Sequence, residues 1–447
     1  MPDLTDRHGY RLSTRVPDAA EAYVTGLDLQ LSLNAGGVEG LAAAVQADPE
    51  FAVGYAALAF AQWYRSDIAA GRASLQEAQR LAVMATSREQ RQIGLVAGFV
   101  NGEAATTLPL MHEYLAEYPR DGLIVHLATM IVAGSGRLHR PQENYDLLAK
   151  LAPAWGDDWW FAGIFAFAHH ELDLLDDARR LAERSLEQNP RNAAGAHPLA
   201  HVFYESNDHA NGAGFLSTWI PEYDRAAPFF CHLNWHLALF ELNQGNIPRV
   251  MALYDNAISP GMGSARTTLV DAASLLWRYE LFGCQPPREL PWAEVCSYVG
   301  KAAPTPGMAF LDAHAALAFT AMGDAEALVK LISGLEALAP SRPVIAEVVL
   351  PLARGIQAFG AGGYAEAIGH LEPLDGQLVR VGGSHAQWEV FEDTLLQAYL
   401  RAGRFEPAEA LLRRRLAKRT SARDVVWLEQ ASAAPSTRHS TPSVLYR

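Results

Sequence analysis

The chain has 447 residues, half of them hydrophobic, and a formal net charge of −14 at pH 7. This length allows two or three globular domains or one long repeat array. A surface of that sign repels phosphate backbones, so we expect no nucleic-acid partner. The three cysteines, Cys231, Cys284 and Cys296, show no CxxC spacing, which argues against a disulfide framework.

The amino-terminal segment MPDLTDRHGYRLSTR has no apolar core of the kind found in secretion signals. No stretch is long enough to span a membrane without a charge, since even the apolar run after Val344 contains Glu347 and Arg354. We therefore expect a cytoplasmic protein that has no membrane partner.

The chain reads as three parts. Residues 1–18 lack helical periodicity and predict an extended lead-in, residues 19–428 carry helical patterns, and residues 429–447 are rich in Ser, Thr, Ala and Pro and predict a flexible tail. Alanine and leucine dominate the long middle part, while β-branched residues are sparse. This composition predicts an all-α protein.

Within the helical part, amphipathic segments end repeatedly at a proline, namely at Pro49, Pro119, Pro153, Pro190 and Pro260. Pro119 and Pro153 are 34 residues apart, which is the period of tetratricopeptide-type hairpins. A lone hairpin cannot bury both faces of its helices, so neighbouring hairpins stack and share a core. The pattern predicts a TPR-like α-solenoid of about ten to eleven helical hairpins, curved or closed around a central pocket.

Histidines concentrate in the middle of this array. His197 and His201 are four residues apart, as are His232 and His236, so each pair shares one face of its helix. Pro198 fits the first turn of its helix. The first helices of successive hairpins lie side by side, so we expect both pairs to converge with His170 on one patch.

Three interpretations of this patch stay open. The rings could fill ordinary packing positions and bond to backbone or carboxylates. They could bind a transition metal, but neither pair has the HExxH form, because Pro198 and Leu233 occupy the second position, and we assign no metal and no cofactor. They could surround an organic ligand between aromatic walls, an interpretation that we favour. The walls would be Trp159, Trp160, Trp219 and Trp235.

The order HPLAHV, H-x-N-W-H-L-A-L-F and, far downstream, GGSHAQ resembles the tetratricopeptide repeat protein 38 family, from about Asp18 to Trp427. The resemblance implies an α-helical repeat fold in a cytosolic protein and carries over no activity. The family typically has an acidic residue where Tyr204 stands, and Glu205 follows. The positions that match its histidine–tryptophan motif are His197, His201, His232, Trp235 and His236, and Asp271 and Arg278 match its later D…WR motif.

Three functions follow as hypotheses. The first is binding of a small-molecule or peptide ligand in a concave pocket lined by His170, Glu171, His197, Glu205, His232, Trp235 and Arg278. The second is an enzyme whose catalytic residues are His201, His236 and Asp271, with acid–base or hydrolytic chemistry. The third is a scaffold that recruits a protein partner. Assembly into a homo-oligomer is left open.

Overall fold

A computed structural model describes residues 4–284, 288–303 and 305–433. All the regular structure of these residues is helical, in twenty-three α-helices and several shorter 3₁₀ and π turns, and a lone antiparallel bridge joins Thr5 to Arg11. The prediction of an all-α, TPR-like solenoid is confirmed. No helix in this part of the chain is long and apolar enough to cross a membrane.

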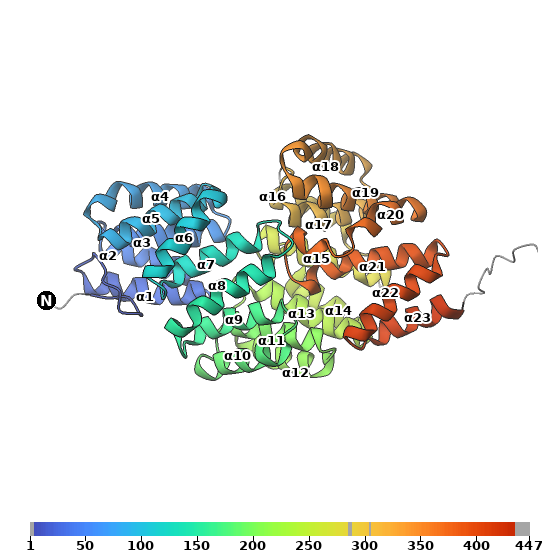
Figure 1. Cartoon of the computed structure of the whole chain (residues 1–447), viewed down its shortest axis with the longest axis horizontal. Coiled ribbons are helices and arrows are strands. Elements are labelled where there is room, and N and C mark those ends of the chain that lie inside the picture. Colours follow the sequence, from blue (N-terminus) through green and yellow to red (C-terminus); the bar gives the residue numbers. More distant parts are fainter. Residues whose placement is uncertain (1–3, 285–287, 304, 434–447) are drawn as a thin grey trace, which may run out of the picture.

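The first third forms four antiparallel pairs (Figure 1). They are α1 (Pro17–Leu31), α2 (Gly37–Ala47), α3 (Ala52–Tyr64), α4 (Ile68–Leu81), α5 (Ser87–Val100), α6 (Ala104–Glu117), α7 (Gly122–Ala133) and α8 (Arg140–Trp155). Some of the prolines that were expected to end helices do so, and one does not. Pro49 and Pro119 follow α2 and α6 by two residues, but Pro153 lies inside α8.

The middle third positions the histidines. It consists of α9 (Trp159–His170), α10 (Leu175–Gln188), α11 (Ala193–Glu205), α12 (His209–Trp219), α13 (Phe230–Asn243) and α14 (Ile247–Leu253), which continues as a π turn, Tyr254–Ile258. The first helices α9, α11 and α13 lie next to one another. The approach of α9 to α11 depends on Gly163, where a Cβ atom would lie 2.7 Å from the Ala194 carbonyl oxygen. Nearly every residue of α13 is buried, so this helix forms an inner wall.

The last third contains α15 (Ala265–Leu281), α16 (Trp292–Ala302), α17 (Ala309–Met322), α18 (Ala325–Leu338), α19 (Leu350–Gly360, after a π turn Ile345–Val349), α20 (Tyr364–Leu371), α21 (His385–Arg401), α22 (Phe405–Lys418) and α23 (Ala422–Ala433). Short 3₁₀ turns span Ala82–Met84, Ile220–Glu222, Ala339–Ser341, Glu372–Leu374 and Leu378–Val381. After the lobe α15–α20, the chain returns, and α21 packs against α15 and touches α11 (Figure 1). Segments from the middle and the end of the chain therefore meet.

Two segment boundaries differ from the sequence-based ones. Helix α1 begins at Pro17, so the lead-in is slightly shorter than residues 1–18. At the other end α23 continues to Ala433, past the expected boundary at 428, because Trp427 and Ala431 pack into the core. The rest of the expected tail, residues 434–447, lies outside the described residues.

Candidate functional site

Four histidines from two neighbouring helices meet at one point. His197 and His201 lie one turn apart on α11, and His232 and His236 lie one turn apart on α13. One ring nitrogen of each lies within 4.8 Å of the corresponding nitrogen of the other three. The Nε2 atom of His197 is 2.9 Å from Nε2 of His201 and 3.1 Å from Nε2 of His232. We call these four residues the histidine cluster.

Three ring nitrogens of the histidine cluster lack a hydrogen-bond partner among the described residues. His236 is fully buried, and within the described part of the chain neither of its ring nitrogens has a partner; the same holds for Nδ1 of His201. A buried polar group without a partner costs on the order of 1–3 kcal/mol, and native structures rarely leave one unexplained. His197, His201 and His232 meet through Nε2 atoms at hydrogen-bond distance, whereas the nitrogens of His236 take no part in these contacts.

The surroundings of three rings of the histidine cluster disfavour their charged form. His201 and His236 have no exposed surface, and His232 retains only 5%. Burial, reinforced by the neighbouring imidazoles, lowers the pKa of His197, His201 and His236 well below the ordinary value. Neutral imidazole is the form that coordinates metal ions.

Asp271 on α15 orients one ring of the cluster. Its carboxylate oxygens lie 3.0 and 3.2 Å from Nδ1 of His232, whose N–H donates to them. With the proton held at Nδ1, the Nε2 lone pair of His232 points toward the other three histidines. A carboxylate behind an imidazole is the usual arrangement around metal-bound histidine.

Aromatic rings pack around the buried cluster. Trp235 stacks on His232 with ring centroids 5.2 Å apart, and its indole N–H donates to the Ser274 hydroxyl. Phe167 stacks on His197 at 5.2 Å, and Phe229 meets the same ring edge-on at 5.1 Å. The sequence reasoning missed both phenylalanines, because only the packing of α9 and of the loop before α13 brings them to this point.

The other predicted site residues are divided between two environments. His170 joins the cluster's edge, with its ring centroid 4.4 Å from that of His201. Glu171 pairs instead with Arg140 at 3.2 Å. Arg278 donates to the Ala386 carbonyl and lies 3.9 Å from the Asp393 carboxylate, although its guanidinium is also 5.9 Å from the Trp235 ring. Asp271 and Arg278 match one motif in the sequence, but they have separate partners, His232 and Asp393.

Glu205 lies one turn beyond His201, but it faces α21 and α22. It accepts from His385 at 2.8 Å and from Arg419 at 3.2 Å. Burial alone would raise the pKa of Glu205, but His385 and Arg419 lower it to about 2. His385 begins α21 in the GGSHAQ motif. The motif is recognisable in the sequence, whereas the pairing of its histidine with Glu205 depends on the fold.

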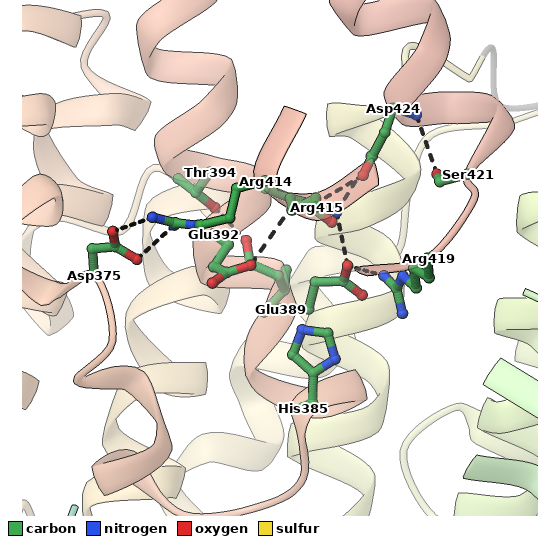
Figure 2. A network of polar contacts seen from close by, with 12 residues as sticks. Asp375, His385, Glu389, Glu392, Thr394, Arg414, Arg415, Arg419, Ser421 and Asp424 are labelled. Carbon is green, nitrogen blue, oxygen red and sulfur yellow. Dashed lines mark hydrogen bonds and ion pairs between the residues drawn. The ribbon is translucent and has the colours of Figure 1, made fainter. Parts of the chain in front are cut away.

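Beyond Glu205 a buried network of ion pairs holds α21, α22 and α23 together (Figure 2). Arg415 donates to Glu389, Asp393 and Asp424, and Arg419 also binds Glu389. The network borders a cavity of about 260 Å³ that His170, Glu171, Glu205 and His385 help to line. Each of the three acids in the network has an arginine partner, so its geometry is that of a structural network.

Two further expectations about the site were wrong. Helix α11 begins at Ala193, so Pro198 lies in its second turn and not in its first. Of the four tryptophans proposed as aromatic walls, only Trp235 contacts the cluster. Trp160 packs near His126 and Trp155, Trp219 on Tyr223, and Trp159 under Arg7.

No protein-family model matches the chain. Among solved structures it is similar to a human IFIT1 dimer with PPP-AAAA (13% identity, 96% of this chain and 98% of that chain, TM-score 0.44). It is also similar to an IFIT1 monomeric mutant with Gppp-AAAA (13%, 93% and 99%, TM-score 0.41) and to yeast Tom70 (12%, 76% and 87%, TM-score 0.38). At such identities the likeness concerns the helical fold alone. It does not show that the chain belongs to the tetratricopeptide repeat protein 38 family, which the sequence motifs resemble.

These complexes contradict one expectation. The acidic composition predicts no nucleic-acid partner, whereas IFIT1 was solved with PPP-AAAA and with Gppp-AAAA. Net charge sums over the whole molecule and does not describe the local potential inside one pocket. The exclusion is therefore withdrawn.

Proposed function

We propose that this TPR-like repeat protein binds one divalent transition-metal ion through His197, His201, His232 and His236. The observation that carries the proposal is the convergence of four imidazoles around a fully buried ring, His236, whose nitrogens have no partner among the described residues. The proposal replaces the sequence-based expectation that no metal is bound.

The distances favour an ion over an organic ligand. A tetrahedral site with metal–nitrogen bonds of about 2.0–2.1 Å has nitrogens about 3.3–3.4 Å apart. The contacts of 2.9 and 3.1 Å and the limit of 4.8 Å bracket that value. No organic group fits among nitrogens at this spacing, so the interior of the cluster suits a single atom.

The donor set indicates the class of metal. Four neutral imidazoles suit Zn²⁺, Cu²⁺, Ni²⁺ or Co²⁺, whereas Ca²⁺ and Mg²⁺ require oxygen ligands. Four protein ligands also complete a tetrahedral shell, which is characteristic of structural sites. In this proposal His201 and His236 are ligands and not acid–base groups, and the ion cross-links two adjacent hairpins through α11 and α13.

The test is metal stoichiometry in the full chain. After loading with Zn²⁺ and dialysis, elemental analysis should give one zinc per chain, and Co²⁺ should give the absorption of a tetrahedral nitrogen site. The variant H236A should lose both signals. H112A, which removes an exposed histidine of α6, is the matched control and should keep them.

His236→Leu tests the same point without a cavity. Because it removes an orphaned polar ring, it should leave the metal-free chain as stable as wild type or more so, while abolishing the rise in Tm that zinc produces in wild type. Equal metal content in wild type and H236L, or no bound metal in wild type, would overturn the proposal.

A further inference from the structure

A second cavity is lined in part by Phe229, which also contacts the histidine cluster. It has a volume of about 660 Å³ and is bounded by the end of α3, by the loop before α13 and by the start of α15. Three arginines, Arg65, Arg225 and Arg266, line it together with Trp63 and Phe229. We call it the arginine pocket.

The arginine pocket is positively charged although the whole chain carries −14. No Asp or Glu lines it, and within the described residues none of its three arginines forms an ion pair. Arg65 donates to the Ala226 carbonyl and Arg225 to the Asn256 carbonyl, which uses one of the five N–H donors that each guanidinium has. The remaining donors have no anionic partner among the residues that the structure describes.

Arg266 differs from the other two arginines because it has no hydrogen-bond partner among the described residues. It is partly buried, and no hydrogen bond or ion pair to a described residue accompanies it. Burial lowers the pKa of Arg266, with no carboxylate nearby to compensate. A partly desolvated cation without a counter-ion is unfavourable, and an anion in the pocket would relieve that cost.

The start of α15 adds to this potential. Ser264 caps the helix by accepting from the Thr267 amide, and Ser264, Arg266 and Thr267 all line the pocket. The amino terminus of a 17-residue helix carries a partial positive charge that favours anions. The Trp63 and Phe229 rings also line the pocket and offer flat apolar surface.

We propose that the arginine pocket binds a small organic anion, in which a phosphate or carboxylate group is attached to an aromatic or apolar body. The planar forks of Arg65, Arg225 and Arg266 match the oxygens of either group, and Trp63 and Phe229 cover the apolar body. Phe229 also packs on His197 at 5.1 Å and on His232 at 5.4 Å, so one ring separates the ligand from the histidine cluster.

Titration calorimetry on the full chain tests the proposal, with phenyl phosphate, benzoate, inorganic phosphate and benzylamine as probes. Phenyl phosphate or benzoate should bind, and comparison with inorganic phosphate separates the contribution of the apolar body. Benzylamine, the cationic analogue, should not bind. R266Q should weaken binding at least tenfold and R266K should recover part of it, whereas R80Q, at an exposed arginine of α4, should have no effect.

Three results would overturn this proposal. They are the absence of binding by both aromatic anions, equal binding of benzylamine, and an unchanged affinity in both R266Q and R225Q. Circular dichroism checks that R266Q and R225Q are folded. If R266Q does not fold, R225Q still tests the proposal. Metal content is a separate readout, because R266Q should still bind one zinc. Failure of the anion-binding proposal can therefore be told apart from failure of the metal-binding proposal.

Discussion

Nδ1 of His232 on α13 lies 3.0 Å from Oδ1 of Asp271 on α15, and both side chains are almost completely buried. The contact joins two successive hairpins of the array. It also fixes the tautomer of His232, so that Nε2 is left as an acceptor facing the other three histidines.

Asp271→Asn should therefore weaken zinc binding without removing a ligand. Outer-shell carboxylates typically contribute ten- to a hundredfold in metal affinity, and we expect a loss in that range. Competition with a chromophoric chelator measures it. The control is D255N, at an exposed carboxylate of the π turn after α14. Identical zinc affinity in D271N and wild type would show that the contact does not orient a ligand.

Arg415→Met should strongly destabilise the carboxyl-terminal helices. Arg415 is buried and binds Glu389, Asp393 and Asp424, so its removal leaves buried carboxylates with fewer partners (Figure 2). Breaking a buried pair in this way costs about 3–5 kcal/mol. The exposed neighbour Arg413, paired with Glu409, is the control, and R413M should cost less than about 1 kcal/mol. Urea unfolding compares the two, and equal losses would contradict the prediction.

Stability should fall on both sides of neutral pH because of the Glu205–His385 pair. The pKa of Glu205 is lowered from 4.5 to about 2 in the folded chain, so its contribution is present above the unfolded value and is lost as the pH falls from about 4.5 toward 2. Burial would lower the pKa of His385, but Glu205 raises it above 6.5, so this contribution is complete below 6.5 and is lost as the pH rises through the folded value.

Glu205→Gln separates these contributions from the rest of the chain. It removes the charge that raises the pKa of His385, so the free energy of unfolding, measured by denaturant titration at a series of pH values, should vary less over both ranges. A pH profile of E205Q parallel to that of wild type would show that other groups set the dependence.

The close contact of α1 with α2 gives a test of packing. A Cβ atom on Gly26 would lie 2.6 Å from the Leu41 backbone nitrogen, so Gly26→Ala forces the two helices apart. We expect a loss of about 1–3 kcal/mol, as for overpacked cores. Gly94 of α5 has no atom within 4 Å of the same position, and Gly94→Ala should stabilise by about 0.5–1 kcal/mol. Thermal unfolding should shift in opposite directions for the two variants.

The sequence by itself determined the helical class, the hairpin repeat and the pairing of histidines on helix faces. Each of these follows from local spacing: an interval of four residues places His197 and His201 on one face wherever the helix lies. The clustering of four histidines was predicted for the same reason, since first helices of adjacent hairpins are neighbours in any such array.

Only the tertiary structure decided what those faces meet. Glu205 and His385 are 180 residues apart and come together because α21 returns to α11. The arginine pocket likewise joins the end of α3 to residues some 160–200 positions further along the chain, namely Arg225 and Arg266. Periodicity reports which side of a helix is apolar, but the register between distant helices depends on packing across the whole core. That register brought the four imidazoles to distances suited to a metal ion and not to an organic ligand.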